Sequence, residues 1–120
     1  MLIFWKQKLA FLAIPKTGTS AYAQALAPVA SLSLQDPPGL KHAPLIRYNR
    51  FIRPMYEIVC NTQLDTMAVI REPISWMGSW YRYRQRPFLK GKPTSTQDIT
   101  FDTFARGYLQ ATPPAYAHIG

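Results

Sequence analysis

The chain of 120 residues is 48% apolar and 13% aromatic, which favours one folded domain and excludes a disordered chain. Lys and Arg outnumber Asp and Glu by 14 to 6, so the net charge is +8 and the expected partners are anions. The single cysteine, Cys60, excludes an internal disulfide and a cysteine-rich metal site, and it is compatible with a reducing compartment.

The N-terminal stretch Met1–Ile14 is apolar only in pieces, because Lys6 and Lys8 interrupt it and Pro15 ends it. It therefore lacks the apolar core of a secretory signal. Nothing in the chain approaches the roughly 20 apolar residues that are needed to cross a bilayer. These features predict a cytoplasmic protein without a transmembrane segment.

Leu9–Ile14 is a short continuous apolar run, which predicts a strand covered on both faces, as in parallel sheets. Ser20–Val29 predicts a helix with Thr19 or Ser20 as its N-cap. A strand, a tight turn and a helix in this order begin a βαβ unit.

The turn between this strand and helix contains Lys16, Thr17, Gly18, Thr19 and Ser20. Gly18 permits a positive φ, the hydroxyl residues add donors, and Lys16 adds an ammonium group. The backbone N–H groups and the dipole of the following helix also attract an anion, so the turn predicts a phosphate-sized site. Taken alone, the same residues could form only a turn and a helix cap. The lysine precedes the single glycine, so the loop does not fit the Walker A form.

Further along, Ser31–Leu34 predicts a brief strand, and Gln35–Gly39 predicts a loop that contains two prolines. His42–Ile52 predicts a short basic helix that closes at Pro54, and Thr66–Ile70 predicts a second compact apolar strand. Strands that alternate with helices favour an α/β sheet.

A helix is predicted from Pro73 to about Arg86, with the proline in its first turn. Its aromatic residues are expected to pack in the core rather than stack on a ligand: Trp76, Trp80, Tyr81 and Tyr83. Its arginines form either a solvated face or a glycan-binding surface: Arg82, Arg84 and Arg86. Phe88–Thr100 is expected to be an exposed loop, and Phe101–Leu109 a short helix opened by Thr100 or Asp102.

A second candidate anion-binding element follows the second strand. Arg71 stands at the end of this strand, and Ser79 lies eight residues later on the next helix. A guanidinium group and a hydroxyl group at one sheet edge could share a second phosphate. The alternatives are that Arg71 pairs with Glu72 or with a helix end, and that Ser79 is an ordinary helix serine.

At this point the chain resembles a known family. Ile14–Ser20 resembles the 5′-phosphosulfate loop of sulfotransferases that use 3′-phosphoadenosine-5′-phosphosulfate (PAPS). Val69–Pro73 with Ser79 resembles their 3′-phosphate motif, including the spacing of eight from arginine to serine. Lys41–Ala43 looks like the Lys-His element of the carbohydrate sulfotransferase branch. The resemblance covers roughly residues 9 to 86.

The resemblance implies a single sulfotransferase-like nucleotide-binding domain over residues 1–120, with an α/β, P-loop-like three-layer sandwich around a parallel sheet. This sandwich is partial, because the family region that completes the adenine and acceptor pockets has no counterpart here. The implied reaction transfers a sulfuryl group from PAPS to a hydroxyl acceptor, with a carbohydrate as the expected acceptor. No metal is required, and no His or carboxylate cluster with ligand spacing is present.

The resemblance also implies a role for each candidate residue. The 5′-phosphosulfate is assigned to Lys16, Thr17, Gly18, Thr19 and Ser20, and the 3′-phosphate to Arg71 and Ser79. Lys16 is expected to neutralise charge on the leaving phosphate, and His42 is the first candidate for the general base. A structural or surface role for His42 is equally open, and the other candidate bases are Glu57, Glu72 and His118.

A second hypothesis comes from a different class of protein. The chain could be a nucleotide- or polyanion-binding module without catalysis. A nucleic-acid-binding function is disfavoured, because no recognised nucleic-acid-binding motif is present. The sequence predicts neither the identity of the acceptor nor the oligomeric state.

Overall fold

The computed structural model describes residues 1–119. The chain divides into two compact units, one formed by Met1–Ile70 and the other beginning at Arg71. Each unit has its own cluster of buried apolar side chains. The two units are therefore described separately.

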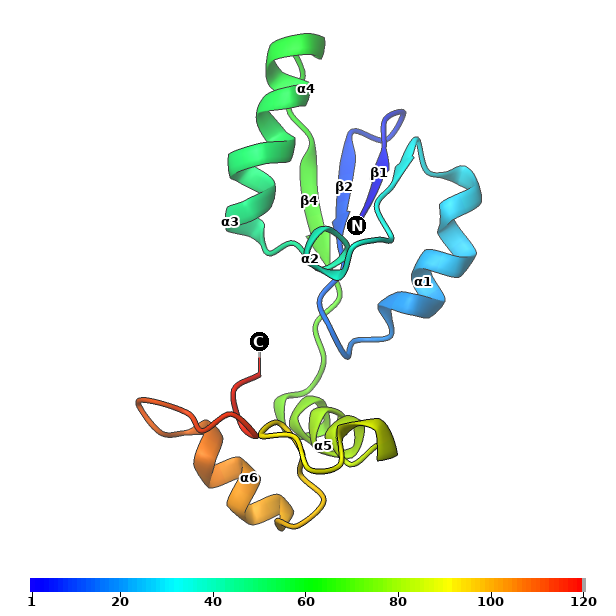
Figure 1. The fold of residues 1–120 in the computed structure, drawn as a ribbon. Coiled ribbons are helices and arrows are strands. Elements are labelled where there is room, and N and C mark those ends of the chain that lie inside the picture. Colours follow the sequence, from blue (N-terminus) through cyan, green and yellow to red (C-terminus); the bar gives the residue numbers. More distant parts are fainter. Residues whose placement is uncertain (120) are drawn as a thin grey trace. The chain divides into compact units, whose positions relative to one another are not determined.

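The first unit is built on a four-stranded sheet with the order β3-β1-β2-β4 (Figure 1). Its strands are β1 (Leu2–Phe4), β2 (Leu9–Leu12), β3 (Leu32–Ser33) and β4 (Asp65–Ala68). β1 runs antiparallel to both β2 and β3, whereas β2 and β4 are parallel. The fold is thus mixed α/β, and the prediction of a parallel sheet is wrong except for the β2–β4 pair.

The antiparallel pair of β1 and β2 is a hairpin that the sequence analysis did not predict. β1 and β2 pair with Phe4 opposite Leu9. The lysines that break the apolar run lie in the connecting turn, where the Lys8 N–H donates to the Trp5 carbonyl at 3.1 Å. Lys8 has a φ of 53°, and its Nζ lies 3.2 Å from the centroid of the Trp5 ring. Lys6 and Lys8 therefore interrupt the apolar run because they occupy the turn between β1 and β2.

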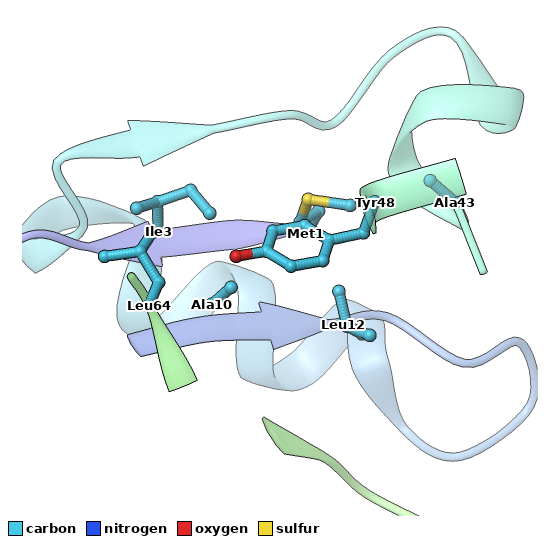
Figure 2. Packing of buried hydrophobic residues seen from close by; sticks show 7 residues of the cluster. All are labelled: Met1, Ile3, Ala10, Leu12, Ala43, Tyr48 and Leu64. Carbon is cyan, nitrogen blue, oxygen red and sulfur yellow. The ribbon is translucent and has the colours of Figure 1, made fainter. Parts of the chain in front are cut away.

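Both faces of β2 are covered, as the apolar run predicted. On one face, Ala10 and Leu12 belong to a core cluster (Figure 2), whose members are Met1, Ile3, Ala10, Leu12, Ala43, Tyr48 and Leu64. Figure 2 shows the ring of Tyr48, which is fully buried, reaching across β1 and β2. On the other face, Phe11 contacts Tyr22 of helix α1 (Thr19–Leu26), with ring centroids 5.7 Å apart.

The helices of the first unit differ from the predictions at their ends. α1 begins one residue early, with Gly18 rather than a hydroxyl residue as its N-cap, and a 3-10 turn follows over Ala27–Val29. A short helix, α2, covers Pro38–Lys41. The predicted basic helix extends further than expected and has three parts: α3 (Leu45–Arg47), a π-helical turn (Tyr48–Ile52) and α4 (Arg53–Cys60). Pro54 does not end it, and stands directly after the π-helical turn as the second residue of α4.

β4 lies at an open edge of the sheet. The predicted strand Thr66–Ile70 is shifted by one residue at its start, and all four residues of β4 are exposed. Met67 has 46% of its surface exposed. This strand is therefore paired on one side only, by β2.

Over residues 71–119, the second unit contains the helices α5 (Pro73–Arg84) and α6 (Phe101–Tyr108), with a 3-10 turn at Pro87–Leu89. The prediction of Thr100 as N-cap is confirmed, because its Oγ1 accepts a hydrogen bond from the Thr103 N–H at 3.2 Å. The core cluster consists of Met77, Phe104, Ala117 and Ile119. Residues of the unpatterned C-terminal stretch thus contribute to the core.

The aromatic side chains of α5 pack as predicted. Trp76, Trp80 and Tyr81 lie against the core cluster of the second unit. Tyr83 makes edge contacts with Trp80 and Phe88, at centroid distances of 5.9 and 6.1 Å. The helix therefore uses its aromatic residues for stability.

Arg84 corrects one alternative of the sequence analysis, because it belongs to neither a solvated face nor a ligand surface. It is buried, and its guanidinium donates hydrogen bonds of 2.7 Å to the carbonyls of Ala115 and His118. Burial lowers the pKa of Arg84. Arg84 therefore fastens the C-terminal segment to α5.

Across residues 1–119, none of the helices combines the length and the hydropathy that a bilayer crossing demands.

Candidate anion-binding site

The first candidate element begins where β2 ends. Leu12 of β2 pairs with Ala68 of β4, so the carboxyl ends of these parallel strands share one edge of the sheet. In α/β sheets, ligands bind at this edge, outside the carboxyl ends of the strands. The loop of residues 13–18 leaves the sheet from there and leads into α1.

The backbone of this loop turns through two left-handed residues. Lys16 has a φ of 68° and Gly18 a φ of 83°. Glycine adopts this conformation without strain, whereas a side-chain-bearing residue pays about 1–2 kcal/mol. Strain of this kind is concentrated at functional sites, and left-handed turns of the backbone gather N–H groups around anions. Lys8 and Asn61 also have positive φ angles, of 53° and 46°, so the left-handed conformation marks a tight turn, and the position of Lys16 after β2 is what makes it a candidate.

The hydroxyl residues of the loop have different positions. Thr17 is buried, and its Oγ1 donates to the Ile14 carbonyl at 2.9 Å, so its hydroxyl proton closes the turn. Thr19 is buried in the first turn of α1, and Ser20 beside it is exposed. Within the described residues, no side chain caps the N-terminus of α1. Thr17 can therefore offer an anion only its backbone N–H, whereas Ser20 can offer a hydroxyl.

His42 contacts the residue at which the loop begins. Its Nδ1 is 2.7 Å from the carbonyl oxygen of Ala13, the residue that follows β2. A carbonyl only accepts, so Nδ1 carries the proton, and in the neutral ring Nε2 is left as the proton acceptor. The structure thus brings His42 to the same sheet edge as the loop of Lys16.

The segment before His42 is held by the N-terminus. The Met1 ammonium donates to the carbonyls of Leu34 and Lys41, at 3.0 and 2.9 Å. Burial, and to a smaller extent the charge of Lys41, lowers the pKa of this ammonium. These hydrogen bonds fix the backbone immediately before the imidazole.

The second candidate element belongs to the second unit. Arg71 is exposed, and its Nε donates to Ser75 Oγ at 2.8 Å. Ser79 lies one helical turn beyond Ser75 on α5 and is half-buried. Sequence reasoning missed Ser75, although its spacing of four from both Arg71 and Ser79 places the two serines on one face of the helix.

The alternative bases have structural partners. Glu72 is the N-cap of α5, and its carboxylate accepts hydrogen bonds from the N–H groups of Ser75 and Ile74, at 2.7 and 2.9 Å. These bonds lower the pKa of Glu72, which makes it a poorer proton acceptor. Glu57 forms an ion pair of 2.8 Å with Arg53. His118 is exposed, and its carbonyl is bound by Arg84.

Residues 1–119 contain no cluster of three or more His, Cys, Asp or Glu side chains that could hold a metal ion.

Comparisons of the chain with protein-family models, with curated proteins and with solved structures give no match. The resemblance to PAPS-dependent sulfotransferases therefore depends on the motifs around Lys16, His42 and Arg71.

Proposed function

We propose that this chain is a PAPS-dependent sulfotransferase, or the donor-binding part of one, with a P-loop-like three-layer fold. One observation carries the proposal: a left-handed Lys16 in the loop that follows β2, at the sheet edge where the His42 imidazole is also held. A helix cap alone does not explain a histidine bonded to the carbonyl that begins the loop.

The loop supports binding of the 5′-phosphosulfate. The uncapped N-terminus of α1 supplies N–H groups and the positive end of a dipole, and Gly18 lets the backbone approach the anion closely. Ser20 adds an exposed hydroxyl and Lys16 a positive charge. The 3′-phosphate is assigned by the resemblance to Arg71 and Ser79, and the bond from Arg71 to Ser75 holds the guanidinium in one orientation.

In the proposed reaction, an acceptor hydroxyl attacks the sulfur of PAPS in line. The new S–O bond forms as the bond between sulfur and the 5′-phosphate oxygen breaks, and the acceptor proton passes to His42 Nε2. Negative charge grows on the leaving phosphate, where the Lys16 ammonium stabilises it. The products are a sulfated acceptor and 3′-phosphoadenosine-5′-phosphate (PAP).

A hydroxyl on a carbohydrate is the proposed acceptor, on the strength of the Lys-His element at Lys41 and His42 and of the basic composition. A cytoplasmic location is part of the same proposal, because the single cysteine is compatible with a reducing compartment.

The first experiment measures PAP binding by calorimetry and then sulfate transfer from labelled PAPS to a panel of sugars. We expect binding of PAP and turnover with at least one acceptor, and His42→Ala should lower turnover about 100-fold or more while PAP binding is kept. Arg50→Ala, at an exposed position on the helix of the first unit, is the matched control and should change neither quantity. Binding without turnover would favour a nucleotide-binding module, and absence of PAP binding would refute the proposal.

A further inference from the structure

Helix α2 has only four residues, and its C-cap is His42. A helix of this length is not stable on its own, because its nucleation costs more free energy than so few hydrogen bonds return. Contacts with other parts of the chain must therefore stabilise it. The same contacts determine how firmly the backbone before the imidazole is held.

The backbone carbonyls from residue 37 to residue 41 all have hydrogen-bond partners. Those of Pro37, Pro38 and Leu40 accept from N–H groups of residues 40–43, at 2.9 to 3.3 Å. The last carbonyls of a helix lack partners within it, and the remaining two carbonyls are bonded by groups from other parts of the chain. The Lys41 carbonyl accepts from the Met1 ammonium, and the Gly39 carbonyl accepts from Arg47 Nη1 at 2.8 Å.

The backbone of Arg47 is itself held by the core of the first unit. Arg47 is the last residue of α3, and its N–H donates to the Pro44 carbonyl at 2.9 Å. The next residue, Tyr48, is fully buried in the core cluster, and its N–H donates to the same carbonyl at 3.0 Å. The guanidinium therefore reaches α2 from a well-anchored position.

Two hydrogen bonds act on His42 in different ways. The bond from Nδ1 to the Ala13 carbonyl joins the end of α2 to the end of β2 (Figure 1), and it orients the ring. The bond from Arg47 to Gly39 holds the backbone three residues before the ring. The ring bond alone does not fix Nε2, since an imidazole can keep one hydrogen bond while its backbone shifts. Both bonds together fix the position of Nε2.

A cap that only stabilises α2 is the simpler role for Arg47, because arginine side chains often bond the last carbonyls of a helix. Arg50 offers a comparison within the same helical segment. It is also exposed, but its guanidinium carbon lies 5.3 Å from the centroid of the neighbouring Phe51 ring. The two roles of Arg47 predict different results: loss of a cap changes only stability, whereas loss of a positioning residue also changes the state of the imidazole.

We propose that Arg47 is a positioning residue, whose hydrogen bond to Gly39 holds His42 with Nε2 directed at the acceptor hydroxyl. This inference rests on the proposed function, because it concerns the proton acceptor named there. Arg47 contacts neither donor nor acceptor in this role and acts through α2. A misplacement of about 1 Å can lower the rate about 100-fold, so a partial loss of orientation should lower kcat about tenfold.

The first measurement is nitrogen NMR of the imidazoles in the full chain, which needs no substrate. At about pH 8.5 an ordinary imidazole is neutral, and the wild-type His42 ring should carry its proton on Nδ1. Arg47→Ala should shift both ring nitrogens towards a mixture of the two tautomers, and Arg47→Lys, which keeps a donor, should restore part of the wild-type spectrum. Arg50→Ala is the matched control and should change nothing.

His118 in the second unit is an internal reference, and its resonances should stay the same in every variant. The melting temperature of each variant is measured as well, so that all spectra are recorded on folded protein. Unchanged His42 resonances in Arg47→Ala, whatever the change in melting temperature, would reduce Arg47 to a helix cap and overturn the proposal.

The second measurement is kinetic. Arg47→Ala should lower kcat for sulfate transfer about tenfold and leave PAP affinity unchanged, and Arg47→Lys should recover part of the loss. A parallel loss of PAP affinity would make Arg47 a binding residue and would contradict the proposal. If the wild-type chain shows no turnover, the proposed function fails, and the NMR result still decides whether Arg47 positions His42.

Discussion

The two candidate anion-binding elements are built in different ways. The loop around Lys16 in the first unit depends on the backbone: two positive φ angles, a hydroxyl bonded inside the turn and an uncapped helix N-terminus. The element of the second unit depends on side chains: Arg71 is held by Ser75, and the helix N-terminus is already occupied by Glu72. We therefore expect anion binding at the loop around Lys16 to be sensitive to its backbone conformation. At Arg71, binding should instead decrease gradually as single side chains are removed.

The largest expected effect comes from removing the charge of the backbone site. If Lys16 stabilises the leaving phosphate, Lys16→Ala should lower kcat about 100- to 1,000-fold and PAP affinity much less. Equal losses in kcat and affinity would make Lys16 a binding residue.

Lys16→Gly serves as the matched control for backbone strain. Because glycine adopts a φ of 68° freely, this variant should be about 1 kcal/mol more stable than Lys16→Ala in chemical denaturation, with the same loss of turnover. Equal stabilities would show that the left-handed conformation stores no strain.

Arg71 should give the next largest effect, and it should depend on the ligand. Arg71→Ala should weaken PAP binding about 10- to 100-fold, as expected for a lost charge-assisted hydrogen bond. Adenosine-5′-phosphosulfate has no 3′-phosphate, so its calorimetric affinity should not change. Ser75→Ala should cost only a few-fold in PAP affinity, because it releases the guanidinium without removing it. A loss of affinity for both ligands would contradict the assignment of Arg71 to the 3′-phosphate.

A substitution at Gly18 tests the loop around Lys16 without changing its charge. A Cβ at this position would meet only Tyr22 Cε2, at 3.9 Å, so space is available and the φ of 83° is the obstacle. Gly18→Ala should therefore weaken PAP binding about 5- to 30-fold through the 1–2 kcal/mol cost of the left-handed conformation. Gly91→Ala, which shares a positive φ and has no close neighbour for a Cβ, is the control and should leave PAP binding unchanged.

The smallest effect concerns stability and pH. The N–H groups of Ser75 and Ile74 lower the pKa of Glu72, so the folded state favours the carboxylate. Its stabilising contribution is present above the pKa of the unfolded chain and is lost as the pH falls through the lowered folded pKa. Glu72→Gln should thus lower Tm by a few degrees at neutral pH and leave Tm unchanged in strong acid. A constant difference at every pH would argue against the charged cap.

Prediction from sequence succeeded where a pattern was local. The apolar run of β2, the turn before α1 and the Thr100 cap all follow from residues within one or two turns. The hairpin of β1 was missed because Lys6 and Lys8 interrupt the apolar pattern, and their role as turn residues becomes visible only once the strands pair.

For the candidate site too, local features were predicted from the sequence and long-range contacts were not. The types and spacing of the loop residues predicted a turn and an anion site. They did not predict the positive φ of Lys16 or the hydrogen bond from the Thr17 hydroxyl to the Ile14 carbonyl. The bond between His42 and Ala13 joins residues 29 positions apart, which no local pattern encodes. Such long-range contacts depend on how the sheet packs.

The contact between His42 and Ala13 has a kinetic consequence for the proposed reaction. The Ala13 carbonyl bonded to the imidazole belongs to the loop that we propose as the donor site, so we expect occupation of the loop to affect the orientation of His42. If the acceptor binds before the donor, the loop that contains Ala13 holds no ligand and orients the imidazole less firmly. Initial rates with both substrates varied should then follow compulsory-order kinetics, with the nucleotide adding before the sugar.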